Sequence, residues 1–175
     1  MGLSFQTARL TVKEADHELS LSERSALHQR IPQILTPAVV ENLPPYFHGI
    51  DSCHLAQQWL ERMLAESRLF LVSSDDRTLM GLLFAYVDND NDAHIGYLLA
   101  QEFWGKGFAS ELLQGFISEV SNSESWNKLI GGVDPSNLAS AKLLQKLGFV
   151  EQVSEEKRVV FFEYWIDRSQ PSRKC

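Results

Sequence analysis

One stretch of the sequence decides the fold: residues 97–110, which read YLLAQEFWGKGFAS. A short apolar run is followed by Gly105 and Gly107, and a helix is predicted to begin at Phe108 or Ala109. Glycine lets the backbone turn tightly and lets its N–H groups come close to a ligand. The start of a helix adds N–H donors without intrahelical partners and the positive end of the helix dipole. The stretch therefore predicts a diphosphate site, and with it a nucleotide-like ligand.

The spacing of the glycines excludes two common nucleotide-binding loops. A Walker A loop needs GxxxxGK[ST], which the sequence lacks. A dinucleotide-binding loop needs GxGxxG after the first strand, whereas here the third glycine is missing and the strand comes late. Because glycine-rich turns are common, the loop by itself leaves an ordinary turn open as well.

The composition is that of a globular protein of one domain. The chain has 175 residues, of which 44% are hydrophobic and 22% charged, and we expect a single domain over 1–175. Its net charge of −7 argues against a nucleic-acid partner and is compatible with a cationic one such as an amine. No apolar run approaches the ~20 residues of a membrane span, and no secretory signal is visible. We therefore expect no membrane partner.

The cysteines agree with a reducing compartment, so a cytoplasmic protein is expected. Cys53 and Cys175 form no CxxC pair and no disulfide framework, and the sequence leaves open whether either has a role.

Hydrophobic periodicity predicts a mixed α/β chain. Strands are expected over 5–13, 69–73, 79–87, 93–100 and 128–133, with a buried closing strand over 159–166. Helices are expected over 16–30, 54–66, from 108 onward, and from Asp134, the predicted cap, to Gly148. Four prolines between positions 32 and 45 predict an irregular stretch there. Early hairpins and late strand–helix alternation predict a partly antiparallel sheet with helices on both faces.

A second motif lies one strand–helix unit after the glycine loop. It reads Asn137-x-x-Ser140 and continues to Leu147-Gly148-Phe149. With this motif the chain resembles the GNAT superfamily of acetyl-CoA-dependent N-acetyltransferases. That family's Q/R-x-x-G-x-G/A loop matches residues 104–109, with Trp104 where Gln or Arg is usual. The opening T-A-R-L-T-V and the I-G-Y before the loop are similar to the RimJ/RimL branch, which acetylates N-termini of ribosomal proteins.

The resemblance implies the fold and the cofactor. The fold is an α/β (α+β) GNAT fold, with a mixed, mostly antiparallel, twisted sheet of about six to seven strands. The cosubstrate is acetyl-CoA: the glycine loop holds its diphosphate, the strand before the loop pairs with its pantetheine arm, and Asn137 bonds a pantetheine amide. The residues expected to contact acetyl-CoA are Leu98, Leu99, Trp104, Gly105, Lys106, Gly107, Phe108, Ala109, Ser110, Asn137 and Ser140. Asn137 has a second interpretation as a helix cap.

The implied chemistry is direct attack of a neutral amine on the thioester. His94 is the expected general base, at a position where relatives often carry Glu; the alternative is an exposed histidine at a strand edge. Many GNAT enzymes protonate the leaving thiolate with a Tyr whose position here is Leu144. Ser140 or a water would then be the donor, or the thiolate would leave unassisted.

Three functions stay open at this point. The leading one is acetylation of a primary amine, most specifically a protein N-terminal α-amine. The others are acetylation of a small amine (a polyamine, aminoglycoside or amino acid) and acetyl-CoA binding without catalysis. Residues 14–66, where acceptors bind in this family, carry no diagnostic motif. The aromatic patch at 46–48 fits an acceptor pocket or a packed loop, and both a monomer and a homodimer are compatible with the sequence.

No metal site is expected. The acidic run at 88–92 lacks the glycine and the glutamate that a calcium loop needs, because Ala93 and Leu99 stand in those places. The five histidines show no metal-ligand spacing.

Overall fold

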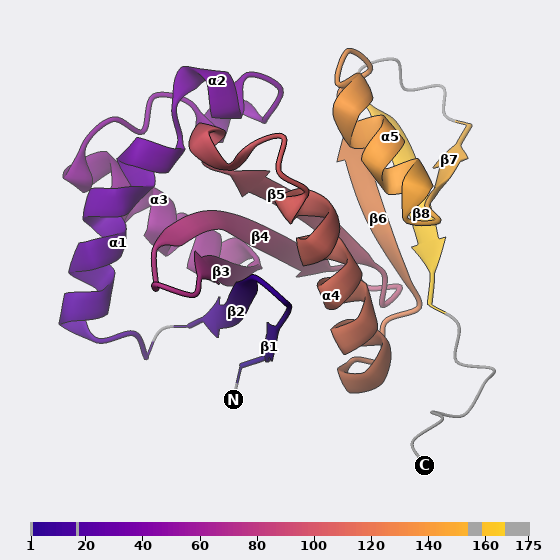
Figure 1. The fold of residues 1–175 in the computed structure, drawn as a ribbon, viewed down its shortest axis with the longest axis horizontal. Helices are drawn as coiled ribbons and strands as arrows, with labels where there is room; N and C mark the ends of the chain where they lie inside the picture. The colour runs from indigo at the N-terminus through magenta and orange to yellow at the C-terminus, as the bar shows by residue number, and fades with distance from the viewer. Residues whose placement is uncertain (1, 17, 154–158, 167–175) are drawn as a thin grey trace. The chain divides into compact units, whose positions relative to one another are not determined.

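The computed structural model describes residues 2–16, 18–153 and 159–166 (Figure 1). Cys175, whose role the sequence left open, lies outside these residues. The elements in chain order are β1 (Ser4–Gln6), β2 (Leu10–Ala15), α1 (Leu21–Ile34), α2 (Pro37–Val40), η1 (Pro45–Phe47), α3 (Cys53–Glu66), β3 (Arg68–Ser74), β4 (Leu79–Val87), β5 (Ala93–Leu99), η2 (Gln101–Phe103), α4 (Phe108–Ser123), β6 (Lys128–Val133), α5 (Leu138–Lys146), β7 (Val150–Gln152) and β8 (Val160–Trp165).

The strands form one mixed sheet flanked by helices, as predicted. Its hydrogen-bonded order is β1-β2-β3-β4-β5-β6-β8-β7. β5 and β6 are parallel, whereas β1–β2, β2–β3, β6–β8 and β7–β8 are antiparallel. The described residues give eight strands rather than six or seven, because the first expected strand is a hairpin and because β7 was not predicted.

The chain folds into two compact units. The first unit comprises Met1–Phe84 and Tyr97–Ala109, and the second comprises Ala85–Gly96 and Ser110–Cys175. The chain passes from one unit to the other within β4, β5 and the first turn of α4.

The first unit opens with a hairpin where a single strand over 5–13 was predicted. The Thr7 N–H donates to the Leu10 carbonyl at 2.9 Å, and the Leu10 N–H donates to the Thr7 hydroxyl at 3.1 Å. This turn separates β1 from β2, which pair antiparallel with Phe5 opposite Val12. The alternating pattern runs through both strands, so periodicity alone did not reveal the turn.

Helices α1 and α3 pack side by side, and α3 lies against β3 (Figure 1). Ser20 and Glu23 form a capping box at the start of α1, and the Ser52 hydroxyl caps α3. The prediction that Pro32 ends the helix was wrong, since α1 continues to Ile34. Ile31 and Ile34 on either side of the proline are fully buried, and this packing compensates for the hydrogen bond that proline removes.

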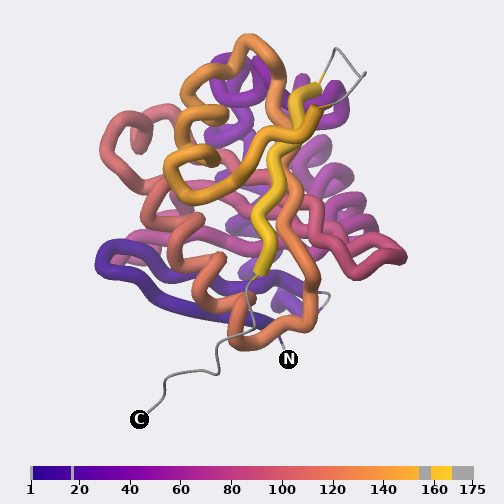
Figure 2. The backbone as a smooth tube through the Cα atoms, turned by 90° about the vertical axis from the view of Figure 1, so that its right-hand side faces the viewer, coloured from indigo at the N-terminus to yellow at the C-terminus, as the bar shows by residue number. Residues whose placement is uncertain are grey.

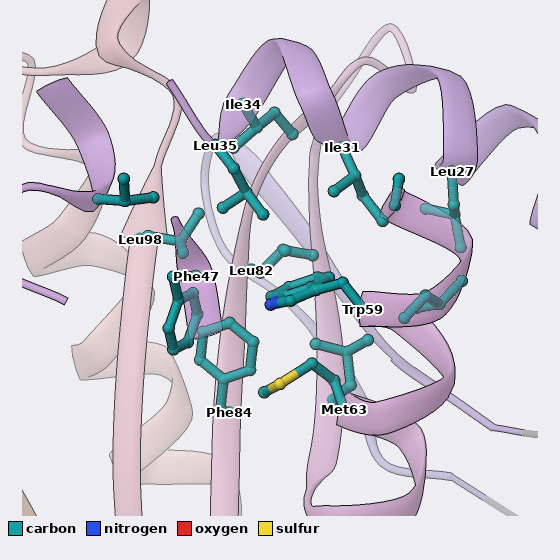
Figure 3. Close-up of a cluster of buried hydrophobic side chains, with 14 of the residues drawn as sticks. Leu27, Ile31, Ile34, Leu35, Phe47, Trp59, Met63, Leu82, Phe84 and Leu98 are labelled. Carbon is teal, nitrogen blue, oxygen red and sulfur yellow. The ribbon is translucent and has the colours of Figure 1, made fainter. Parts of the chain in front are cut away.

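The core of the first unit is an aliphatic and aromatic cluster (Figure 3). Phe47, Trp59 and Phe84 meet edge to face at its centre, with ring centroids 5.4–6.2 Å apart. Leu27 and Ile31 of α1 and Leu98 of β5 belong to the same cluster. The core thus includes β5 shortly before the glycine loop.

The second unit contains the β6–β8–β7 ladder, in which β6 and β8 run side by side (Figure 2). α5 packs on β6 and β7. The helix predicted from residue 108 onward is confirmed as α4, which has one apolar stripe with Leu112, Leu113, Phe116 and Val120 buried.

The closing strand β8 is only half buried, contrary to the prediction. Phe162 is fully buried, but Trp165 is 64% exposed and has the Lys128 ammonium 4.7 Å from its ring centroid. The continuous apolar run therefore concealed an ordinary strand with one buried face.

None of the helices in the described residues is long and apolar enough to span a bilayer.

Candidate functional site

The glycine loop has the backbone geometry of an anion cradle. Gly105 and Gly107 have φ of +73° and +80°, in the left-handed region that favours glycine. Among the residues described, the N–H groups of Gly105, Lys106 and Gly107 have no acceptor in the protein. The next N–H groups belong to the first turn of α4, where helix geometry leaves them without intrahelical acceptors. A run of exposed donors thus ends at the positive end of a helix dipole, which fits a diphosphate.

Trp104 fastens the loop to the end of β5. Its indole Nε1 donates to the Leu99 carbonyl at 2.9 Å, while the side chain stays 46% exposed. The Leu99 carbonyl can accept a second hydrogen bond, because a carbonyl oxygen has two lone pairs. Phe103 and Phe108 pack edge to face across the loop at 6.1 Å. These contacts tie the loop to the end of β5 and to the first residue of α4.

Arg9 also contacts this loop, although we predicted no role for it from the sequence. It lies in the turn between β1 and β2, and its Nη1 donates to the Lys106 carbonyl at 3.0 Å. Its Cζ is 4.1 Å from the centroid of the Phe108 ring. The only available signal was the T-A-R-L-T-V opening, which indicated a branch of a family and not a contact.

Asn137 and Ser140 are brought together at the start of α5. The Asn137 side-chain oxygen accepts from the Ser140 N–H at 3.2 Å, so Asn137 is the cap of this helix. The prediction of a cap at Asp134 was wrong. Asp134 instead accepts from the N–H and the hydroxyl of Ser136, and it shapes the turn before the helix.

His94, the expected base, lies at the start of β5 beside Asp88. Its Nε2 is 2.9 Å from Asp88 Oδ2, and its side chain is 43% exposed. The hydrogen bond from His94, together with the N–H groups of Asp92 and Asp90, lowers the pKa of the Asp88 carboxyl. The Asp88 carboxylate therefore orients the imidazole. This partner was not predicted because the acidic run was considered only as a candidate calcium loop.

The same turn brings three carboxylates close together. Single oxygens of Asp88, Asp90 and Asp92 lie within 4.8 Å of one another. Asp88 is already engaged by His94 and two backbone N–H groups. The expectation that the protein binds no metal stays a prediction.

A family model for the acetyltransferase (GNAT) domain matches residues 19–150, well over half of the chain. The chain belongs to the GNAT acetyltransferase family. The resemblance read from the glycine loop and the N-x-x-S motif is thereby confirmed.

Solved GNAT structures have the same fold. One is RimL, a ribosomal L7/L12 α-N-protein acetyltransferase in complex with coenzyme A, with a TM-score of 0.77 and 18% identity over 94% of this chain and 99% of that one. Another is the spermidine/spermine N-acetyltransferase SpeG of Vibrio cholerae in mutant forms, with a TM-score of 0.64 and 18% identity over 89% of this chain and 93% of that one. At such identities the likeness concerns the fold alone.

A curated relative is more similar in sequence over a shorter segment. The "Uncharacterized N-acetyltransferase p20" of Bacillus licheniformis is 37% identical over 83 residues, which cover 47% of this chain and 47% of that protein. The match thus spans about half the length of this relative.

Leu144 occupies the position at which the resemblance to GNAT enzymes implied a Tyr. It is 2% exposed, and a Cβ added to Gly131 of β6 would lie 3.1 Å from its Cδ1. The side chain at this position therefore packs on the sheet and supplies no acid.

Of the three residues in the aromatic patch at 46–48, only Phe47 is packed in the core. Phe47 is buried in the core cluster, and His48 Nε2 lies 2.9 Å from the Leu43 carbonyl. Tyr46 stays 36% exposed, with the Arg62 guanidinium 4.3 Å from its ring centroid. Burial raises the pKa of the Tyr46 hydroxyl. Tyr46 and His48 are therefore the exposed residues of this patch, and its interpretation as an acceptor pocket stays a prediction.

Proposed function

We propose that this GNAT chain transfers the acetyl group of acetyl-CoA to a primary amine. The observation that carries the proposal is the glycine loop, in which two glycines with positive φ expose consecutive N–H groups at the start of α4. Acetyl-CoA would supply an acetyl thioester that an amine attacks directly. No nucleophilic side chain is required for this reaction.

The proposed contacts with the donor follow the residues named from the sequence. N–H groups from Gly105 to Ser110 would hold the diphosphate, with the Trp104 indole bracing the loop. Backbone groups of Leu98 and Leu99 would pair with the pantetheine arm as an added strand. Asn137 would offer its side-chain amide nitrogen, since its oxygen caps α5. Ser140 would face the donor from the same turn.

The proposed chemistry moves one proton off the amine and one acetyl group onto it. The neutral amine nitrogen bonds to the carbonyl carbon, and a strand N–H steadies the oxyanion that forms. His94, oriented by Asp88, would accept the proton that this nitrogen must then lose, directly or through water, and the carbon–sulfur bond breaks as the oxyanion collapses. The thiolate would take a proton from Ser140 or water, or leave unassisted, because a thiol has a pKa of about 8.5.

A protein N-terminal α-amine is the acceptor we propose first. With a pKa near 7.8, roughly 10–20% of such an amine is neutral at pH 7, whereas a lysine at about 10.4 is neutral only ~0.04% of the time. The difference corresponds to about 3.5 kcal/mol, so an α-amine needs only a modest base such as an exposed imidazole. The fold likeness to a ribosomal-protein acetyltransferase supports the same choice.

A small polyamine is the second candidate. The net charge of −7 favours cationic acceptors, and SpeG, which has the same fold, is named for spermidine and spermine. Acetyl-CoA binding without catalysis is the third candidate, and the packed Leu144 is the observation that keeps it open.

A panel of acceptors separates these candidates. The full chain is incubated with acetyl-CoA and, in turn, with peptides bearing free α-amines, the same peptides with blocked N-termini, spermidine, an aminoglycoside and free amino acids. We expect CoA release with the free peptides and none with their blocked forms. Release with spermidine but with no peptide would overturn the N-terminal assignment. Tight binding of acetyl-CoA with no release in any reaction would favour the non-catalytic module.

A further inference from the structure

Arg9 reaches the glycine loop from a distant part of the sequence within the first unit. It lies between β1 and β2, 97 residues before Lys106, whose carbonyl accepts a hydrogen bond from its Nη1 at 3.0 Å. Arg9 belongs to none of the motifs that indicate a donor site. Those motifs therefore do not explain why Arg9 contacts the loop.

The guanidinium covers three consecutive residues of the loop. It bonds the Lys106 carbonyl, its Cζ lies 4.1 Å from the centroid of the Phe108 ring, and a Cβ added to Gly107 would lie 3.5 Å from its Nη2. A planar group that donates in its plane and stacks on a ring is fixed in both position and orientation. The contact thus constrains the loop and not merely the arginine.

The constraint sets the direction of a donor in the cradle. The Lys106–Gly107 peptide is trans, like every described peptide bond, so its carbonyl and its N–H point in opposite directions. Because Arg9 holds the carbonyl on its own side, the Gly107 N–H points away from the arginine. We infer that Arg9 is a positioning residue for the diphosphate cradle, which fixes the Gly107 N–H toward the phosphate. This inference rests on the function proposed above.

Two further properties suit arginine to this position. The guanidinium is charged at every physiological pH, so it adds a permanent positive charge beside the loop of a chain whose net charge is −7. A lysine would supply the charge but would lose the planar stacking on Phe108 and the fixed direction of the donor. Arg9→Lys should therefore rescue only part of the effect of Arg9→Ala.

The test measures binding and needs no acceptor. Calorimetric titration with CoA and NMR titration with pantetheine, which lacks the diphosphate, are carried out on the wild type, Arg9→Ala and Arg9→Lys. Arg77→Asn is the charge-matched control, because Arg77 is an exposed turn residue of the first unit with φ of +67°, which asparagine tolerates. Thermal unfolding of each variant confirms that it is folded.

We expect Arg9→Ala to raise the Kd for CoA about tenfold and Arg9→Lys about threefold, the range expected from one oriented hydrogen bond. The Kd for pantetheine should stay within about twofold in both variants, and Arg77→Asn should bind both ligands like the wild type. Unchanged CoA binding in folded Arg9→Ala would overturn the inference. Equal weakening of CoA and pantetheine would overturn it as well, since the effect would not belong to the diphosphate. Failure of the wild type to bind CoA would instead overturn the proposed function itself.

Discussion

Asn137 caps α5 with its side-chain oxygen and, in the proposed function, contacts acetyl-CoA with its amide nitrogen. Two substitutions separate these roles. Asn137→Ala should lower the free energy of unfolding by about 1 kcal/mol, the usual value of a cap, and should weaken CoA binding. Asn137→Ser keeps a capping oxygen but has no amide, so it should keep the stability and still lose up to about tenfold in CoA affinity.

Chemical denaturation and calorimetry on the same samples give both quantities. If Asn137→Ser binds CoA as tightly as the wild type, Asn137 is a cap only and its amide does not contact the donor.

The role of His94 as the base is tested by the pH dependence of the reaction rate. His94→Gln should lower kcat roughly ten- to hundredfold with little change in acetyl-CoA binding, and it should change the shape of the pH–rate profile. Asp88→Asn should have an intermediate effect, because the imidazole loses the carboxylate that orients it.

Asp90→Asn serves as the control for the acidic turn, since Asp90 lies in the same turn while the carboxylate that contacts His94 belongs to Asp88. The rate of each variant is measured from pH 5.5 to 9. A His94→Gln profile with the same shape as that of the wild type would remove His94 as the base.

At the scale of the elements, Gly81 permits the close approach of β4 and β5 before the glycine loop. A Cβ at this position would overlap the Leu98 carbonyl oxygen and would lie 2.8 Å from Leu99 Cδ2. Gly81→Ala should therefore lower the free energy of unfolding by about 1–3 kcal/mol, as for overpacking. It should also weaken acetyl-CoA binding, because Leu98 and Leu99 would move.

Gly132→Ala in β6 is the matched strand variant. The neighbours of its added Cβ are the ends of the Val159 and Phe161 side chains, 3.1 Å away and beyond, so it should cost less than Gly81→Ala. Equal stability of both variants and unchanged CoA affinity in Gly81→Ala would contradict the role of this contact.

Glu14 and Arg68 link β2 to β3 through a two-point ion pair, with N···O distances of 2.9 and 2.8 Å. Burial raises the pKa of the Glu14 carboxyl, but the hydrogen bonds from Arg68 and the Leu3 N–H outweigh it, so the pKa is lowered. A lowered pKa stabilises the fold fully above the pKa of the unfolded carboxyl, and this stabilisation is lost as the pH falls through the folded pKa.

Glu14→Gln should therefore lower the free energy of unfolding by about 1–3 kcal/mol at pH 7, and the difference from the wild type should shrink below about pH 4.5. Glu66→Gln, which breaks an exposed pair with Arg62, should change it by less than about 1 kcal/mol. Urea unfolding at pH 7 and at pH 3.5 gives the comparison. A constant difference at both pH values would show that the ion pair is not its source.

Hydrophobic periodicity was sufficient to predict some helices and strands from the sequence but not others. α3 and α4 could be predicted closely because each has one buried apolar stripe. The start of α5 could not, because Asp134, Ser136 and Asn137 are all capping residues and only the backbone decides which of them caps. The prediction that Pro32 ends α1 was wrong for a different reason. Burial of the neighbouring side chains in the core outweighs the local preference of proline against a helix interior.

At the scale of the whole molecule, the sequence revealed the donor motifs but not all of their partners. The glycine loop belongs to the first unit, and the Asn137–Ser140 motif belongs to the second. Arg9 contacts the glycine loop, and Asp88 contacts His94. No local sequence pattern encodes these two contacts, because the first depends on the β1–β2 hairpin and the second on the turn after β4. Residues 14–66, which were expected to bind the acceptor, contribute Phe47 and Trp59 to the core.

The central claim is that the glycine loop binds the diphosphate of acetyl-CoA, and calorimetric titration of the full chain with acetyl-CoA tests it most directly. The wild type is compared with Gly107→Glu and with Gly49→Glu, its matched control, since Gly49 is exposed and has nearly the same φ of +73°. We predict one acetyl-CoA bound per chain in the wild type and in Gly49→Glu, with Gly107→Glu at least about a hundredfold weaker through charge repulsion and lost backbone approach. Equal affinity of Gly107→Glu and the wild type, or no binding by the folded wild type, would contradict the claim.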